Sequence, residues 1–505
     1  MNDASIRGTL VLLLCFAPMD PLEILSVSSV VAPFAKTGGL ADVCNALPAG
    51  LVRHGERARA VMPFYGRVRK EVRAKPVPGL QSLRFEMGGK DYGASVHRTT
   101  LPGSKTEVLL VDVPGLFDGD AIYDGDRDAL RFLAFSRAVI ALMQWEGRAP
   151  DILHCHDWHT ALLPLFLKKA YDWDRLFAQT KTVLTIHNLG YQGVVPASHI
   201  GALGLEPIRS ALHQDELAQG RFSCLLHGIL YADVLTTVSK TYAREIRTPE
   251  HGMGLDRVLE ARKDSLFGIV NGIDDRIWNP RTDTAIAATY DAEDRSGKVR
   301  CKKDLAKHFG LELGPTTPLF GIVSRLTPQK GFELLPDVLP VFLQREDMAL
   351  VVLGSGDERH ERYFAWLEDA FRGRVGFHRG YDDALAHRIE AGADAFLMPS
   401  RYEPCGLNQL YSLAYGTIPI VRRTGGLADT VVDWDPETGA GNGFVFDDFT
   451  SAALQQAIRR CLDAWKFDKG WARLQENAMA VDFSWDKQIL EYVTLYERLA
   501  RRSSV

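Results

Sequence analysis

The sequence has few cysteines and no paired cysteine motif. Seven cysteines are spread over 505 residues, and none of them forms a CxxC arrangement. A sparse set that is odd in number suggests neither a disulfide framework nor a structural zinc site. The cysteine content therefore favours a reducing compartment, and we expect the protein to be cytoplasmic.

The sequence also lacks an apolar run long enough to cross a bilayer. The one membrane-like stretch is Thr9–Ala17 (TLVLLLCFA), whereas a spanning helix needs about 20 apolar residues. With Arg7 before it, this stretch resembles the apolar core of a secretory signal. The alternative, which we favour, is an over-extended gene start with Met19 as the initiator. We treat residues 1–18 as an extension and expect no membrane partner.

No excess of positive charge is present. Lys and Arg number 59 against 64 Asp and Glu, which gives a formal net charge of −5. Because nucleic-acid binding usually needs a basic face, we expect no nucleic-acid partner. Neither a Walker A motif nor GxGxxG occurs, so the standard ATP and dinucleotide cradles are not expected. The 46% apolar content and the length indicate a globular protein of two or three domains.

Short β-branched runs alternate with longer helical patterns, which predicts repeated βα units and parallel sheets. In the first half, strands are expected at 23–28, 57–62, 108–113, 151–155, 182–187 and 233–238. In the second half, they are expected at 318–324, 348–353, 374–377, 395–398 and 418–421. The turn-rich segment Asn271–Pro280 predicts the break between the halves.

Unusual polar segments follow the predicted strands in both halves, where parallel sheets place their ligands. These segments are 36–39, 154–159, 187–193, 324–331, 354–357, 380–381, 400–406 and 423–426. A single one of them is explained by a solvated loop or a helix cap. The whole set favours a cleft between two facing domains.

Two of these loops suit a sugar bound to a diphosphate. Arg325 and Lys330 form a compact cationic loop at a helix start, which would stabilise anionic oxygens. Glu403 stands before another helix start that contains glycine, a position suited to a sugar hydroxyl. The ordinary alternatives are a surface ion pair for Arg325 and a first-turn acid for Glu403.

The histidine-rich segment HCHDWH does not predict a metal centre. Alternation along a strand sends His154 and His156 to one face, and His159 follows nearby. No further ligand pair at helical spacing and no HExxH occur, so we favour core histidines beside one substrate-binding acid. Cys405 has no base near it in sequence, which argues against a nucleophilic role.

Several motifs together resemble the bacterial glycogen synthases and plant starch synthases. They are KTGGLADV, HDWH, TIHNLGYQG, TVSKTYAREI, NGIDDRIWNP, VSRLTPQKG and PSRYEPCGLNQLYSLAYGTIPIVRRTGGLADTV. The motifs stand in family order over some 95% of the chain. The resemblance implies two Rossmann-like domains facing each other across a deep cleft, the GT-B arrangement. It also implies a retaining transfer of glucose from ADP-glucose to the non-reducing 4-OH of an α-1,4-glucan such as glycogen.

The resemblance implies four catalytic residues. His187 would lie below the anomeric carbon and help to stabilise a cationic sugar. Arg325 and Lys330 would hold the leaving ADP, and Glu403 would touch the glucose. In the transition state the sugar becomes oxocarbenium-like while charge collects on ADP, so cations and a carboxylate would stabilise both charges. We therefore expect no metal and no other cofactor.

Further residues are implied to bind substrate. Lys36 and the Gly38–Gly39 turn would face the diphosphate and the glucose. Asp157 and Asn188 would bind sugar hydroxyls or the acceptor side, and Tyr381 would stack on adenine. The phosphate end would be lined by Cys405, Gly406, Leu407 and Asn408.

The chain departs from the family pattern at three positions. Val30 stands where family members usually have Glu, Leu226 replaces a lysine, and Asn408 replaces a common threonine. The first two departures concern the glucan-side groove more than the donor site. The expected domains are 19–275 on the acceptor side and 276–482 on the nucleotide side. A C-terminal helix in 483–505 is expected to cross back to the first domain.

Three other functions compete with glucan synthesis. One is a transferase of the same fold that uses a UDP-sugar, and another is a glucan phosphorylase, which needs a lysine-bound pyridoxal phosphate. The third is a binding protein with a decayed site, against which the retained Lys36, His187, Arg325, Lys330 and Glu403 argue.

Overall fold

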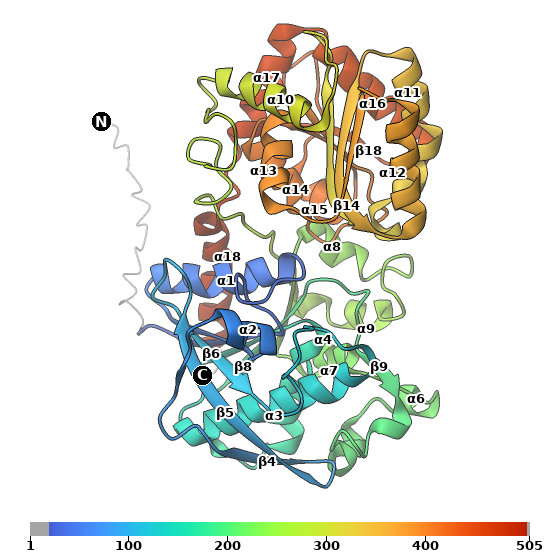
Figure 1. Cartoon of the computed structure of the whole chain (residues 1–505). Coiled ribbons are helices and arrows are strands. Elements are labelled where there is room, and N and C mark those ends of the chain that lie inside the picture. The colour runs from blue at the N-terminus through green and yellow to red at the C-terminus, as the bar shows by residue number, and fades with distance from the viewer. Residues whose placement is uncertain (1–19, 502–505) are drawn as a thin grey trace, which may run out of the picture.

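The computed structural model describes residues 20–501, so Thr9–Ala17 and Met19 lie outside the described part of the chain (Figure 1). Two α/β units follow one another along the chain, each built on its own sheet. The predicted fold class is confirmed. All eleven predicted strands are present, with every end within three residues of its expected place. Within residues 20–501, no helix is long and apolar enough to cross a membrane.

The first unit contains a ten-stranded sheet with the order β12-β11-β8-β7-β1-β2-β6-β5-β3, and β4 pairs with β5. The strands from β12 to β6 run parallel to one another. Beyond β6, strand β5 pairs with it in the antiparallel direction. The strands are β1 (Glu23–Val27), β2 (Arg57–Pro63), β3 (Lys75–Pro76), β4 (Leu83–Met87), β5 (Lys90–Thr100), β6 (Glu107–Asp112), β7 (Ile152–His156), β8 (Lys181–Ile186), β11 (Val234–Thr237) and β12 (Leu266–Gly268). A separate pair consists of β9 (Val194–Pro196) and β10 (Arg221–Ser223).

Helices cover the first sheet and its cleft edge (Figure 1). They are α1 (Gly39–Arg53), α2 (Gly66–Glu71), α3 (Asp128–Glu146), α4 (Asp157–Thr160), α5 (Leu162–Leu165), α6 (Gln214–Ala218), α7 (Cys224–Tyr231), α8 (Lys240–Glu245) and α9 (Asp256–Ala261). The central strands are buried along their length, as expected when helices shield both faces of a parallel sheet.

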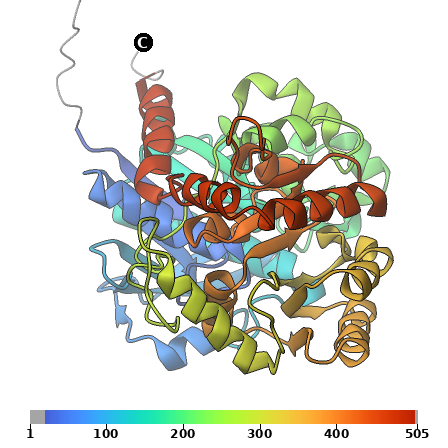
Figure 2. The same cartoon turned by 90° about the horizontal axis from the view of Figure 1, so that it is seen from above.

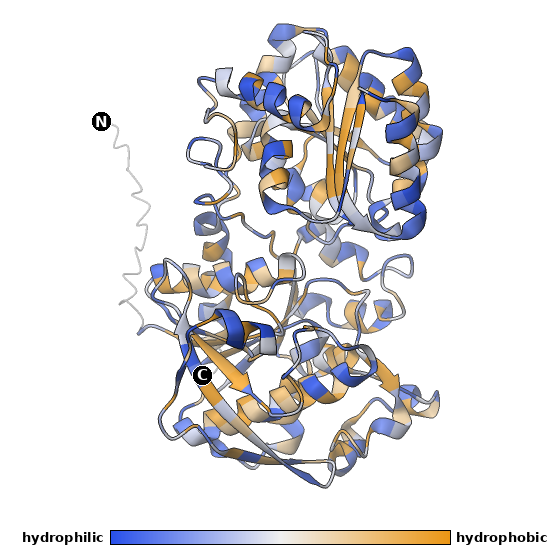
Figure 3. Cartoon of the chain, viewed as in Figure 1, coloured by the Kyte–Doolittle hydropathy of each residue, from blue (hydrophilic) through white to orange (hydrophobic). Residues whose placement is uncertain are grey.

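The second unit contains a six-stranded parallel sheet with the order β15-β14-β13-β16-β17-β18, the doubly wound arrangement. Its strands are β13 (Leu319–Leu326), β14 (Ala349–Gly356), β15 (Val375–Arg379), β16 (Ala395–Met398), β17 (Ile418–Arg422) and β18 (Phe444–Phe446). Its helices are α10 (Ser296–Phe309), α11 (Leu339–Arg345), α12 (Glu358–Ala370), α13 (Asp383–Gly392), α14 (Asn408–Ala414), α15 (Gly425–Thr430), α16 (Ser451–Trp465) and α17 (Asp468–Met479). Hydropathy colouring shows apolar strands inside and polar helix faces outside (Figure 3).

Strand register brings the functional loops of each unit to one edge. Cys155 of β7 is paired with Val27 of β1 on one side and with Leu184 of β8 on the other. The three strands therefore end level with one another. The loops that follow them leave the sheet side by side, facing the second unit.

The last helix, α18 (Trp485–Arg501), lies on the first unit although the chain reaches it from the second (Figures 1 and 2). Ile489 packs so closely on α1 that a Cβ at Gly50 would come within 2.5 Å of its side chain. Arg53 and Asp486 form an ion pair of 2.8 Å beside this contact. The chain passes from the first unit to the second near Ile273 and returns to the first unit near Phe483. These two segments meet where the Ile273 N–H donates to the Phe483 carbonyl. The boundaries at residues 275 and 482 stay a prediction.

The two units also bind each other through a reciprocal contact between α8 and α15. Asp429 of α15 accepts from the backbone N–H and the hydroxyl of Thr241 at the start of α8. In return, Glu245 of α8 accepts from the backbone N–H of Gly425 and from the Thr424 hydroxyl at the start of α15. Each carboxylate thus satisfies N–H groups at the start of the other helix.

Candidate active site

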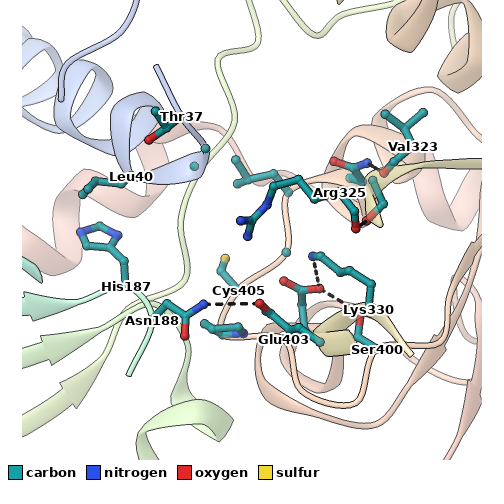
Figure 4. Close-up of a pocket in the computed structure, with 18 of the residues that line it drawn as sticks. Thr37, Leu40, His187, Asn188, Val323, Arg325, Lys330, Ser400, Glu403 and Cys405 are labelled. Atoms are coloured by element: carbon teal, nitrogen blue, oxygen red, sulfur yellow. Dashed lines mark hydrogen bonds and ion pairs between the residues drawn. The ribbon is translucent and has the colours of Figure 1, made fainter. Parts of the chain in front are cut away.

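A cavity of about 1060 Å³ lies between the two units. The loops at the carboxyl ends of both sheets line it, and Figure 4 shows His187 and Asn188 on one side and Arg325 and Lys330 on the other. The structure brings all fourteen predicted site residues to this cavity: Lys36, Gly38, Gly39, Asp157, His187, Asn188, Arg325, Lys330, Tyr381, Glu403, Cys405, Gly406, Leu407 and Asn408. The roles of these residues stay a prediction.

Glu403 is held rigidly in the cavity wall. Its Oε2 accepts from Lys330 Nζ at 2.6 Å and from the Ser400 hydroxyl at 3.0 Å. Gly425 packs directly behind it, so that a Cβ there would lie 1.9 Å from the Glu403 carbonyl oxygen. With φ at +44° as well, position 425 requires glycine. Glu403 thus presents a carboxylate held in a fixed orientation at the cavity.

Arg325 differs from Lys330 because its guanidinium is exposed at the cavity. It stands near the end of β13 and extends into the open space (Figure 4). Within residues 20–501, no carboxylate forms an ion pair with it. The neighbouring backbone is held by Asn408, whose side-chain amide donates to the Val323 carbonyl at 2.6 Å. An unpaired guanidinium on a fixed strand is well suited to bind an anionic ligand.

On the opposite wall, Asp157 organises the loop after β8. It has a left-handed backbone (φ 55°), which is uncommon for residues other than glycine. Its Oδ1 accepts from the backbone N–H of His187 at 2.7 Å, which joins the ends of β7 and β8. Burial raises the pKa of Asp157 to about 7, while the N–H groups of His187 and Asn188 act in the opposite direction. At least one carboxylate oxygen of Asp157 therefore holds the backbone of the cavity wall in place.

Two of the three histidines of HCHDWH, His154 and His156, are buried and do not line the cavity, whereas His159 is mostly buried but lines it. The rings of His154 and His156 lie 4.1 Å apart, and both have hydrogen-bond partners within the protein. Among residues 20–501, no group of three His, Cys, Asp or Glu residues is arranged to hold a metal ion. His159 lies apart from this pair, with its ring stacked on Tyr123.

Burial also makes the stability of the protein depend on pH. The pKa of His154, His159 and His187 falls to about 3, and that of His156 falls well below its usual range, because burial opposes the charged form. Below about pH 6.5 the unfolded chain binds these four protons and the folded protein does not. Asp157 has the opposite effect on stability, because its raised pKa keeps one proton bound in the folded state that the unfolded chain releases. We therefore expect the free energy of unfolding to fall between about pH 7 and pH 5, by on the order of 1 kcal/mol per pH unit for each net proton.

Thermal unfolding followed by circular dichroism over this range tests the expectation. His159→Asn removes one buried imidazole and should make the dependence on pH shallower. His54 is exposed, so His54→Asn should leave the dependence unchanged. A melting temperature that is constant over this range, or a slope that His159→Asn does not alter, would contradict the assignment.

Two further predicted binding residues, Lys36 and Tyr381, also have partners in the protein. Lys36 forms an ion pair with Asp42 at 2.8 Å at the start of α1. The Tyr381 hydroxyl donates to Asp383 at 2.6 Å, while the residue remains 70% exposed at the cavity rim. The ring is therefore available for stacking. Lys36 would have to share its charge between Asp42 and an anionic ligand.

Gln329 and Ser400 line the cavity but were not predicted as site residues. The Asn188 side-chain amide donates to Gln329 Oε1 at 3.5 Å, a contact that crosses the cleft. Ser400, which donates to Glu403, lay in a predicted loop but was given no role. The loops that carry these residues were predicted because they follow strands. Gln329 meets Asn188 only because the two units face each other, whereas Ser400 and Glu403 belong to the same loop. Val30 and Leu226 are buried in the first core and do not line this cavity.

Comparison with known proteins gives concordant matches. A family described as the starch synthase catalytic domain matches residues 23–261, and one described as glycosyl transferases group 1 matches residues 305–479. The glycogen synthase of Koribacter versatilis is 43% identical over 492 residues, 94% of this chain and 98% of that protein. The glycogen synthase of Thermotoga maritima is 41% identical over 483 residues, 94% of this chain and 99% of that protein. The chain belongs to the glycogen synthase family.

Solved structures agree with the family. The catalytic domain of starch synthase IV from Arabidopsis thaliana, bound to ADP and acarbose, superposes with a TM-score of 0.87 at 34% identity. The match covers 95% of this chain and 100% of that one. Sucrose-phosphate synthase from Thermosynechococcus elongatus has a TM-score of 0.58 at 18% identity, which shows the shared GT-B fold alone. As a glycogen synthase family member, the chain is a glucosyltransferase of glycogen or starch synthesis.

Proposed function

We propose that the protein transfers glucose from ADP-glucose to the non-reducing 4-OH of an α-1,4-glucan, with retention of configuration at the anomeric carbon. The observation that carries the proposal is the arrangement of charge in the cavity. Arg325 and the pair of Lys330 and Glu403 lie on one wall, and His187 lies on the other. The related starch synthase IV catalytic domain, described as bound to ADP, supports an adenine nucleotide as the leaving group.

At the donor end, the bond between the anomeric carbon and the diphosphate breaks, and its electron pair leaves with ADP. Arg325 and Lys330 stabilise the charge that collects on the phosphate oxygens. Both are positioned before the reaction begins, since Lys330 is fixed by Glu403 and Arg325 is carried by β13. Tyr381 supplies an exposed ring for the adenine at the rim.

At the sugar end, the anomeric carbon becomes cationic and joins the 4-OH oxygen of the acceptor, whose proton passes to the phosphate oxygen of the leaving ADP. His187 stabilises this cation through its carbonyl and its neutral imidazole. Glu403 binds the glucose with its fixed negative charge, and this interaction strengthens as positive charge develops on the ring. Asn188 and Asp157 shape the acceptor side of the same wall.

A donor assay tests the proposal. The protein is incubated with glycogen and radiolabelled ADP-glucose or UDP-glucose, and label is counted in the polymer. We expect ADP-glucose to be preferred by at least about tenfold in kcat/KM, a difference of about 1.4 kcal/mol in transition-state binding. Digestion of the labelled product by an enzyme specific for α-1,4 bonds should release the label. Preference for UDP-glucose, or label in a linkage that resists digestion, would overturn the proposal.

A further inference from the structure

His156 contacts His187 directly from within the protein interior. Its Nδ1 lies 3.0 Å from His187 Nε2, and its Nε2 lies 3.1 Å from the Ser26 hydroxyl. His156 is fully buried on β7, so solvent cannot replace either contact. One ring nitrogen of His187 is therefore committed to His156. The orientation of the imidazole in the cavity wall depends on this hydrogen bond.

A second layer holds His156 in turn. The ring of His154 lies 4.1 Å from it, between the hydroxyls of Thr185 and Tyr496. His154 Nε2 is 2.6 Å from Thr185 Oγ1, and its Nδ1 is 2.7 Å from the Tyr496 hydroxyl. Tyr496 belongs to α18, which the chain reaches only after it has passed through the second unit. The chain thus returns 342 residues later to supply this hydrogen bond.

We propose that His156 is a positioning residue for His187, and that α18 supports it through Tyr496 and His154. This inference rests on the proposed function, in which His187 faces the reacting sugar. It assigns to the C-terminal helix an influence on the reaction in addition to its packing on α1.

The chemistry of these positions favours positioning over simple packing. All four ring nitrogens of His154 and His156 have a hydrogen-bond partner inside the first unit or on α18. Packing alone needs no such groups, because apolar residues would fill the same space without the cost of burying polar atoms. A network with every member paired instead fixes ring orientation, as the partners of an active-site histidine commonly do.

Tyr492 provides a matched comparison within the same helix. It lies one turn before Tyr496 and is equally buried, but its hydroxyl has no hydrogen-bond partner among residues 20–501. Replacement of either tyrosine by phenylalanine removes one buried oxygen from α18. Only the change at 496 also removes a partner of His154.

The experiment uses the full-length protein with ADP-glucose and glycogen. Tyr496→Phe should lower kcat by about fivefold, and His156→Leu by about 100-fold, because small errors in position are costly in the transition state. KM for both substrates should stay within about twofold of the wild-type value. Tyr492→Phe should retain wild-type kcat. His156→Asn, which keeps a donor and an acceptor, should recover part of the loss caused by His156→Leu.

A spectroscopic readout separates positioning from stability. With ¹⁵N-labelled histidine, the ring nitrogens of His187 should change in chemical shift in His156→Leu and Tyr496→Phe, and stay unchanged in Tyr492→Phe. Equal kcat in the two phenylalanine variants would overturn the role of α18. Wild-type kcat and an unchanged His187 spectrum in His156→Leu, or in His156→Phe if the leucine variant does not fold, would overturn the role of His156. If the wild-type protein transfers no glucose from either sugar nucleotide, the proposed function fails, and the spectra alone then decide whether His156 and Tyr496 orient His187.

Discussion

Replacement of Glu403 by alanine should lower kcat by about 10²–10³-fold while the protein stays folded. The carboxylate is fixed by Lys330 and Ser400 in the wall of the cavity, where we propose that the sugar becomes cationic. Because that attraction grows as the transition state forms, its loss should appear mainly in kcat. Glu403→Gln keeps the shape and the acceptor for Ser400 but loses the charge, so it should be impaired nearly as severely. Steady-state kinetics with ADP-glucose and glycogen measure both variants.

A control for Glu403 lies on the same unit. Glu333 pairs with Arg401 at 2.6 Å and does not line the cavity. Glu333→Gln therefore removes an ion-paired carboxylate near the loop without touching the proposed site, and its kcat should match the wild-type value. Turnover of Glu403→Ala within about tenfold of wild type, a cost of only about 1.4 kcal/mol, would reject a role for this carboxylate in the transition state.

Replacement of Arg325 by alanine should weaken ADP binding by about 10–100-fold, because a charge-assisted hydrogen bond contributes about 1.5–3 kcal/mol. The guanidinium is exposed at the cavity and has no ion pair within the described residues, so its removal leaves no buried charge behind. The melting temperature should consequently stay unchanged. Isothermal titration calorimetry with ADP gives the affinity, and circular dichroism gives the melting temperature.

Lys330 should behave differently from Arg325. Lys330→Ala should also weaken ADP binding, but it leaves Glu403 buried without its cation and should therefore lower stability. Arg423 serves as the control, since it pairs with Asp447 at 2.5 Å outside the cavity. Arg423→Ala should retain full ADP affinity. Unchanged ADP affinity in both Arg325→Ala and Lys330→Ala would contradict the assignment of the diphosphate.

The sequence predicted the parallel core of each sheet more completely than its antiparallel edge. A strand such as β16 is a continuous apolar run because both of its faces are covered. The hairpin of β4 and β5 was missed. In β4, buried and exposed residues alternate, so the strand contains no apolar run. Its apolar face became recognisable only where it packs against the rest of the first core.

The candidate site was likewise predicted only in part. Positions after strands and the motif KTGG located the loops, since a parallel sheet presents the carboxyl ends of its strands at one edge. The partners within the site did not follow from spacing. Ser400 lies three residues from Glu403, but Lys330 reaches the same oxygen from 73 residues away. Asn188 meets Gln329 only because the two units face each other.

By itself, the sequence determined the strands of the two parallel cores and the loops that carry the site. These features depend on periodicity and on turn chemistry within a few residues, which local spacing encodes. The tertiary structure alone decided that Tyr496 supports His154, that His156 contacts His187 and that Asp429 binds the start of α8. Such pairs join segments far apart in the chain. Their geometry follows from how the sheets and helices pack, because packing, rather than spacing along the chain, determines which buried polar groups meet.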